Sequence, residues 1–291
     1  MAVAHTGVQA GETPRERPDQ PEVKHHGPWL GIYTALVMAY LFLPVVVIIL
    51  FGFNDPVGRF NFVFTRFTLD NYRTLFENEE LTTSLQNSLS VAALSTLVAV
   101  TFGTLIALAL TRYRFRGRSS LNLFLFVPMA TPEIVLGVSL LALFVTLNVD
   151  RGFLTILIAH IMFSISYVVV TVKARTSGLD TNLEDAAQDL GATPLTSFWT
   201  VTFPLIFPGI LAAGLLVFIL SLDDYVVTVF NAGGTAMFPL WIYGASRIGV
   251  PPEVNIMGTL IFAIGAVYVI IVLLRERGLL GDIQKYAGRR I

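Results

Sequence analysis

Six long stretches of this 291-residue chain are almost free of charge, and they constrain its fold more than any other feature. A helix needs about 20 apolar residues to cross a bilayer, because each residue rises about 1.5 Å and every backbone amide must be satisfied within the segment. The stretches that qualify are residues 28–53, 87–111, 119–149, 152–172, 203–231 and 254–274. The sequence therefore predicts an all-α membrane protein with six transmembrane helices.

The composition supports a membrane protein and excludes cysteine-based chemistry. Apolar residues make up 54% of the chain and charged residues 13%, and the mean hydropathy is +0.71. A soluble core of this size cannot hide so many apolar side chains, so many of them must face lipid or neighbouring subunits. The chain has no cysteine, which excludes a disulfide framework, a thiolate metal site and a cysteine nucleophile.

The basic residues predict the orientation in a bacterial inner (cell) membrane. With the amino terminus inside, the cytoplasmic segments carry 14 Lys and Arg and the outer segments carry 5, as expected because positive loops resist translocation. We therefore expect both termini in the cytoplasm. The expected domains are a disordered cytoplasmic tail (1–27), a transmembrane domain (28–278) containing a cytoplasmic loop (173–203), and a basic cytoplasmic tail (279–291).

The loop at 173–203 carries the most informative local pattern. Residues 184–190 favour a helix with acidic residues in its first turn, where they complement the helix dipole. Gly191 suits the end of that helix, and Thr193 and Pro194 suit the cap and first turn of a second one. The sequence predicts a short helix across the cytoplasmic face, followed by a glycine turn and a helix that re-enters the membrane.

This loop resembles the EAA loop of binding-protein-dependent ABC importer permeases. In that family an acid and two alanines are followed after three residues by glycine, and after nine more by an Ile-x-Leu-Pro run. Here Asp replaces Glu, Val201 replaces Ile and Phe203 replaces Leu, and each change keeps the chemical type. The alternative is an ordinary connector in which glycine and proline only punctuate the chain. The residues that the resemblance assigns to ATPase coupling are Asp185, Ala186, Ala187, Gly191 and Pro204.

The resemblance extends over roughly residues 87–274 and implies the MetI-like fold of a type I ABC importer permease. It also implies the partners: a homologous permease subunit, a cytoplasmic ABC ATPase dimer, an extracytoplasmic solute-binding protein and the lipid membrane, with no nucleic acid. The chain lacks the Gly-x-x-x-x-Gly-Lys-Ser/Thr phosphate loop, so we expect ATP-Mg to be used by the partner ATPase. We expect a transport subunit without a cofactor, metal or catalytic residue of its own.

Ionisable residues inside the apolar stretches are candidates for the solute pathway. A charge in hydrocarbon costs about 2.5–3.5 kcal/mol on insertion scales, so such residues usually face a polar interior. Glu133, Asp223 and Asp224 lie in these stretches, where we expect no basic partner for them within the subunit, which suits a pathway for a cation. Tyr225 can stack on a cation, although anchoring at the membrane interface is its alternative.

Structural roles are the alternatives for these polar residues. Adjacent aspartates point about 100° apart on a helix, so one of the pair can face the pathway while the other caps, snorkels or pairs across a subunit boundary. Glu133 follows Pro132, where freed backbone groups need partners. A lone histidine in a span, such as His160, is more often hydrogen-bonded between helices than a ligand.

Two further segments resemble a particular group within this family. The runs SLDDYVVTVF and PLWIYGASRIGVPPEVN, together with PEIV in the third stretch, resemble the second permease subunit of spermidine/putrescine importers. This resemblance implies a small cationic solute that moves inward, although permeases for other organic cations, thiamine, iron or opine-like solutes share much of the pattern. The alternative function is a secondary transporter or channel driven by an ion gradient, with Glu133 or the aspartates as a proton site.

Overall fold

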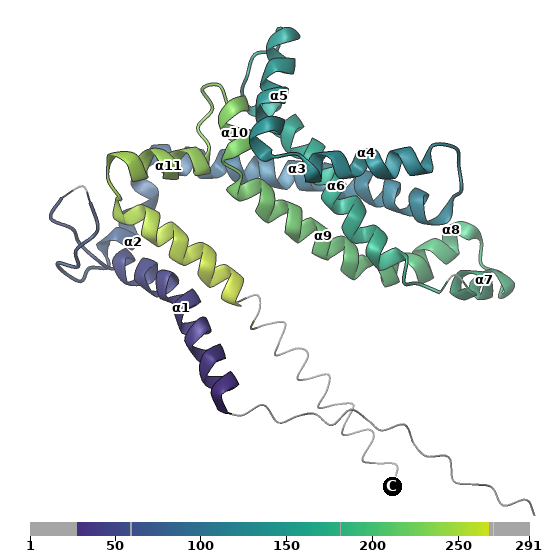
Figure 1. The fold of residues 1–291 in the computed structure, drawn as a ribbon, viewed down its shortest axis with the longest axis horizontal. Coiled ribbons are helices and arrows are strands. Elements are labelled where there is room, and N and C mark those ends of the chain that lie inside the picture. The colour runs from purple at the N-terminus through teal and green to yellow at the C-terminus, as the bar shows by residue number, and fades with distance from the viewer. Residues whose placement is uncertain (1–27, 59, 181, 268–269, 271–291) are drawn as a thin grey trace, which may run out of the picture. The chain divides into compact units, whose positions relative to one another are not determined.

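The computed structural model describes residues 28–58, 60–180, 182–267 and 270, and these form helices joined by short connections (Figure 1). The tails expected at 1–27 and 279–291 lie outside the described residues. The chain divides into two units, residues 1–47 and residues 48–291. The first unit contributes most of α1 (Pro28–Gly52), a helix with Pro44 inside it and no charged residue.

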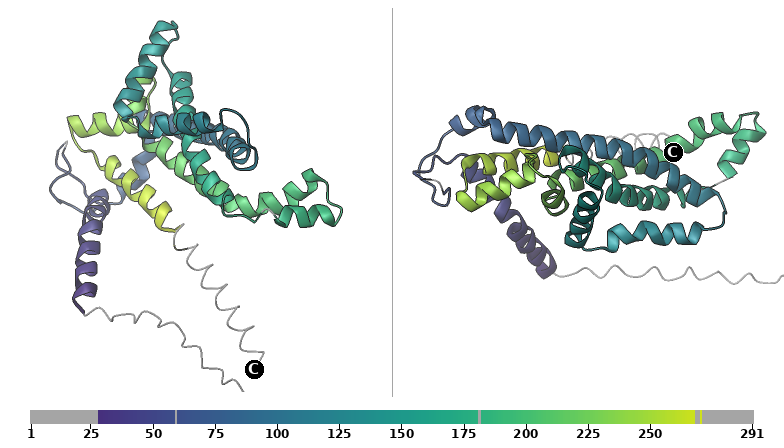
Figure 2. Two further views of the ribbon diagram at one scale, coloured as in Figure 1. Left: turned by 45° about the vertical axis from the view of Figure 1, so that its right-hand side comes forward. Right: turned by 90° about the horizontal axis from the view of Figure 1, so that it is seen from above.

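Three long helices form the centre of the second unit. They are α3 (Glu79–Arg112), α6 (Phe153–Thr176) and α9 (Phe203–Asp223), which pack against one another side by side (Figures 1 and 2). Most side chains in their shared core are alanine or valine, including Ala99, Val168 and Ala213. Small residues let helix backbones approach closely in a membrane. At Gly103 the approach is so close that a Cβ would lie 2.7 Å from the Val168 side chain.

The third apolar stretch is broken, whereas the sequence predicts one span over 119–149. It forms α4 (Arg118–Ala130) and α5 (Glu133–Thr146), whose axes differ by 104° (Figure 1). The break has a local cause, because Pro132 lacks a backbone N–H and pushes the residue before it out of helical geometry. Thr131 is accordingly extended, with φ −79° and ψ 131°.

The fifth stretch is also interrupted, although the sequence predicts a helix over 203–231. α9 ends at Asp223, Asp224 is extended with ψ 111°, and the shorter α10 (Val226–Asn231) follows. After a turn come α11 (Phe238–Ile248) and a helix over Pro252–Val267. Residues 271–274 of the expected sixth span lie outside the described residues.

The described residues contain four helical segments long and apolar enough to cross a membrane: α1, α3, α6 and the segment Pro194–Asp223 that ends with α9. The bent pair α4 and α5 makes a fifth if it counts as one span. The connection before α3 forms α2 (Asp70–Thr74) and a 3-10 turn, Leu75–Glu77. Beyond Asn78, which caps α3 by accepting a hydrogen bond from the Leu81 amide, the same segment already belongs to α3.

Candidate functional site

The loop between α6 and α9 folds as its turn residues predict. It forms α7 (Asn182–Asp189) and, after Gly191 at φ +92°, the short α8 (Pro194–Ser197). A left-handed residue at this position is strained unless it is glycine. The Thr193 side chain caps α8 by accepting a hydrogen bond from the Thr196 amide at 3.2 Å. A π-helical turn, Phe198–Thr202, then leads into α9.

Glu184 fixes this loop to the three-helix core. Its carboxylate pairs with the Arg112 guanidinium at the end of α3 and accepts a hydrogen bond from the Thr202 hydroxyl just before α9. Arg112 also donates to the Thr202 hydroxyl at 3.2 Å. The position of α7 is therefore tied to two core helices at once. The sequence predicts the helix that contains Glu184 but does not single this residue out, because its partners are 72 and 18 residues away.

The residues predicted to couple to an ATPase lie on the outside of this anchored loop. Asp185, Ala186 and Gly191 are exposed and Ala187 is half-buried, while Pro204 is exposed in the first turn of α9, where its missing N–H costs nothing. Large apolar side chains are exposed beside them: Leu190 at 91%, Leu195 at 68% and Trp199 at 55%. An exposed apolar patch of this kind is typical of a surface that another protein covers.

A cavity of about 600 Å³ brings together the four residues predicted for the solute pathway. Glu133 comes from the start of α5, while Asp223, Asp224 and Tyr225 come from the break between α9 and α10. α5 and α10 pack directly against each other, so the two interruptions in the helices meet at one place. Phe163 and Tyr167 of α6 add aromatic surface to the cavity, and its lining includes no Lys, Arg or His.

Asp224 is the buried member of the aspartate pair. Its side chain is 8% exposed, and it accepts hydrogen bonds from the Thr228 amide at 2.8 Å and the Thr228 hydroxyl at 3.0 Å. It thereby caps the first turn of α10. Its carboxylate also lies 3.3 Å from Nε2 of His160, so the expectation of acids without a basic partner in the spans is corrected for Asp224.

His160 belongs to a buried polar network that joins four helices. Its side chain is completely buried, with Nδ1 2.7 Å from the Ser221 hydroxyl and Nε2 3.1 Å from the Thr228 hydroxyl. Ser221 in turn lies 3.2 Å from the Ser95 hydroxyl on α3. The histidine is hydrogen-bonded between helices, as the sequence predicts. The serines could not be singled out from the sequence, because their importance depends on the alignment of three helices.

The other two acids remain available to a ligand. Asp223 and Glu133 are exposed, and neither carboxylate pairs with a basic side chain among the residues that the structure describes. Glu133 does not bond the backbone groups freed by Pro132 in this part of the chain, so the structural alternative for it gains no support. Tyr225 lies in the same wall of the cavity, with its ring 4.7 Å from that of Tyr243 on α11.

Comparisons with known proteins agree on one class. The model of the family described as "Binding-protein-dependent transport system inner membrane component" matches residues 99–277. The spermidine/putrescine transport system permease protein PotC of Escherichia coli is 38% identical over 259 residues, which cover 87% of this chain and 97% of that protein. The putrescine transport system permease protein PotI of the same species is 36% identical, covering 84% and 88%.

A solved structure shares the fold at low sequence identity. It is the crystal structure of a bacterial ABC transporter involved in the import of the acidic polysaccharide alginate. The similarity covers 88% of this chain and 99% of the matched chain, with a TM-score of 0.63 and 18% identity.

Proposed function

Since the chain belongs to the family of binding-protein-dependent transport system inner membrane components, we propose that it lines the pathway by which an ABC importer moves a polyamine such as putrescine or spermidine. The observation that carries this proposal is the cavity lined by three carboxylates and three aromatic rings without a basic side chain. Carboxylates attract ammonium groups, and aromatic faces hold them by cation–π contact. The names of the related proteins PotC and PotI favour the same solutes.

The two aspartates have different roles in this proposal. Asp224 is held by His160 and the first turn of α10, so it keeps the wall of the cavity in place. In the described part of the chain no ion pair holds the carboxylate of Asp223 or Glu133, so in this proposal these two acids contact the ammonium groups of the solute. A cation that passes through the cavity neutralises the charge of these two carboxylates, which otherwise carries a free-energy cost within a membrane.

Coupling to ATP takes place at the opposite end of α9. We place α7 and α8 in the cytoplasm, where Asp185, Ala186, Ala187 and Gly191 contact a dimeric ATPase that binds and hydrolyses ATP-Mg. The exposed apolar side chains around this loop support such a contact. A homologous permease completes the pathway, and an extracytoplasmic binding protein delivers the solute. Closure of the ATPase dimer moves α7 and switches the pathway between inward and outward access.

Removal of the free acids tests the proposed pathway. In the assembled transporter in proteoliposomes, we expect Glu133→Gln combined with Asp223→Asn to reduce ATP-driven uptake of radiolabelled putrescine at least about tenfold, since each lost contact with a charged group is worth about 1.5–3 kcal/mol. Asp150→Asn is the matched control, because this exposed acid lies outside the cavity.

Assembly and basal ATP hydrolysis must stay normal in both variants for the comparison to count. Uptake equal to that of the unmodified transporter would remove Glu133 and Asp223 from the pathway. The alternative of an ion-gradient-driven transporter or channel has no observation in its favour now that the family is known.

A further inference from the structure

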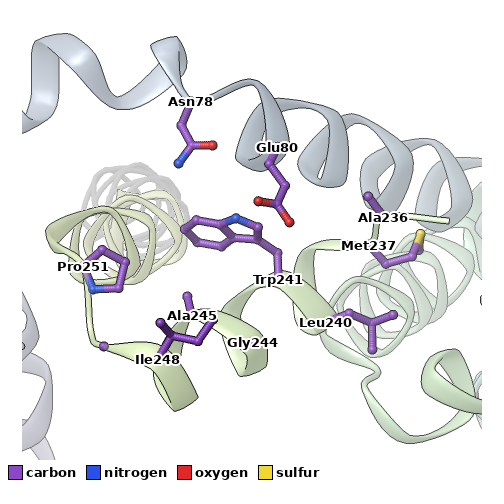
Figure 3. Close-up of a pocket in the computed structure, with 11 residues that line it drawn as sticks. Asn78, Glu80, Ala236, Met237, Leu240, Trp241, Gly244, Ala245, Ile248 and Pro251 are labelled. Carbon is purple, nitrogen blue, oxygen red and sulfur yellow. The ribbon is translucent and has the colours of Figure 1, made fainter. Parts of the chain in front are cut away.

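A second cavity, of about 500 Å³, lies where the beginning of α3 meets α11 (Figure 3). Glu80 extends from the first turn of α3 toward the indole of Trp241 on α11, and the Asn78 side chain points into the same space. Apolar side chains, among them Leu240 and Ile248, complete the walls. The cavity therefore combines one carboxylate, one large aromatic face and an apolar surface.

The two sides of this cavity are fixed relative to each other. The Phe238 amide at the start of α11 donates to the Ser88 hydroxyl of α3 at 2.9 Å. The Asn87 side chain of α3 donates to the Ala236 carbonyl oxygen, also at 2.9 Å. One side of Trp241 packs on the buried cluster formed by Leu75, Leu81, Phe238, Ile256 and Met257. These contacts fix the separation of the two helices that carry Glu80 and Trp241.

The charge in the cavity has no partner among the residues that the structure describes. Glu80 is exposed, is the single titratable residue among the lining residues, and forms no ion pair or hydrogen bond with the described part of the chain. Arg247, the basic residue of α11, is engaged elsewhere, since it donates to the Tyr243 hydroxyl and lies 4.8 Å from the centroid of that ring. The Trp241 indole N–H likewise finds no acceptor among the described residues.

We propose that this cavity binds a primary alkylammonium group between the Glu80 carboxylate and the Trp241 indole. A carboxylate supplies the charge, the face of tryptophan is the best cation–π partner, and the apolar walls accommodate the alkyl chain. An anion finds no basic side chain in the lining, and a neutral apolar ligand would bury the unpaired carboxylate.

α11 connects this ammonium site with the acidic cavity. Trp241 and Tyr243 are two positions apart on the helix and so point in nearly opposite directions. The ring of Tyr243 packs against that of Tyr225 in the acidic cavity, with the centroids 4.7 Å apart and the planes tilted by 40°, while Trp241 faces the ammonium site. In the orientation proposed above, the site lies at the outer mouth, and its role as the first binding place of the solute rests on the proposed function.

The fluorescence of Trp241 offers a direct test of binding. The chain has three tryptophans, so Trp29→Phe with Trp199→Phe leaves Trp241 as the only one. The purified full-length chain with these changes is titrated with putrescine at constant ionic strength, in a background of Glu133→Gln and Asp223→Asn that disables the acidic cavity. We expect a saturable change in emission, and we expect Glu80→Gln to weaken binding about threefold to tenfold, since the charge pair is partly exposed.

Glu79→Gln is the matched control, because the neighbouring acid is also exposed in the first turn of α3 but does not line the cavity. Equilibrium dialysis with radiolabelled putrescine, with and without Glu80→Gln, measures the same site without relying on emission. The result does not depend on ATP or on partner subunits, so it is independent of the test of transport.

The ammonium group can come from a free polyamine or from a lysine side chain of a partner protein. Binding of putrescine that requires Glu80 assigns the site to the solute. Binding of the tripeptide Gly-Lys-Gly but not of putrescine keeps the ammonium chemistry and assigns it to a protein lysine. Binding of neither probe, or equal binding after Glu80→Gln, would overturn the proposal.

Discussion

Replacement of His160 by leucine probes the buried network most directly. The change removes the contacts of the imidazole with Asp224, Ser221 and Thr228, whose distances are 3.3, 2.7 and 3.1 Å. Each buried polar group that loses its hydrogen-bond partner costs about 1–3 kcal/mol, and the imidazole leaves three such groups behind. Asp224 and Thr228 keep the bonds between them and Ser221 keeps its contact with Ser95, so the lower end applies to each group and we expect a total loss of about 3 kcal/mol.

A loss of this size can be measured by thermal unfolding of the purified chain in detergent. For a chain of this length each kcal/mol shifts the melting temperature by about 2–4 °C, so His160→Leu should lower it by about 6–12 °C. His160→Asn is the conservative variant, since an amide can still bond one of the hydroxyls, and it should lose less. A mutant cycle with Asp224→Asn should show strongly non-additive effects, because both residues belong to one pair.

Thermal unfolding and uptake measured together distinguish the roles of Asp223 and Asp224. Asp223→Asn should leave the melting temperature unchanged and reduce uptake, whereas Asp224→Asn should lower the melting temperature, since it weakens the cap of α10 and the pair with His160. If His160→Leu melts like the unmodified protein, or if the two changes add without interaction, the reasoning that Asp224 is a positioning residue is wrong.

Two further variants test the coupling surface and the packing of the core. Ala186→Arg on the exposed face of α7 should abolish uptake while the basal ATPase activity of the assembled transporter remains, and Gln188→Arg, on another side of the same helix, should be tolerated; equal uptake by both would reject the coupling surface. Gly103→Leu should destabilise the chain by about 1–3 kcal/mol in thermal unfolding, because a Cβ there already lies 2.7 Å from Val168, and Val168→Ala should recover part of the loss. Full stability of Gly103→Leu would show that α3 and α6 do not pack so closely.

The sequence predicts the elements whose cause is local. Apolar length identifies α3, α6 and α9, and turn chemistry identifies α7, the left-handed Gly191 and the cap of α8 by Thr193. Each of these features depends on residues a few positions apart. The family resemblance also rests on a local pattern, and the family model that matches residues 99–277 confirms the family.

Features that depend on distant contacts could not be predicted in the same way. Apolarity continues through Thr131 and Pro132, so hydropathy alone does not reveal the sharp bend between α4 and α5. The choice between Asp223 and Asp224 depends on where His160 lies, 64 positions away from Asp224 on another helix. The cavity near Glu80 could not be predicted for a similar reason, because an exposed acid in a first helical turn is common and Trp241, which lines the same cavity, is far away in the sequence.

The anchoring of α7 by Glu184 has a mechanical consequence. The carboxylate accepts a hydrogen bond from Thr202, directly before the start of α9. The 21 residues of that helix span about 30 Å, and Asp223 is its last residue. The same carboxylate of Glu184 forms an ion pair with Arg112 at the end of α3. A force applied to α7 therefore acts on α3 and α9 together, and the far end of α9 carries an acid that lines the cavity proposed for the solute.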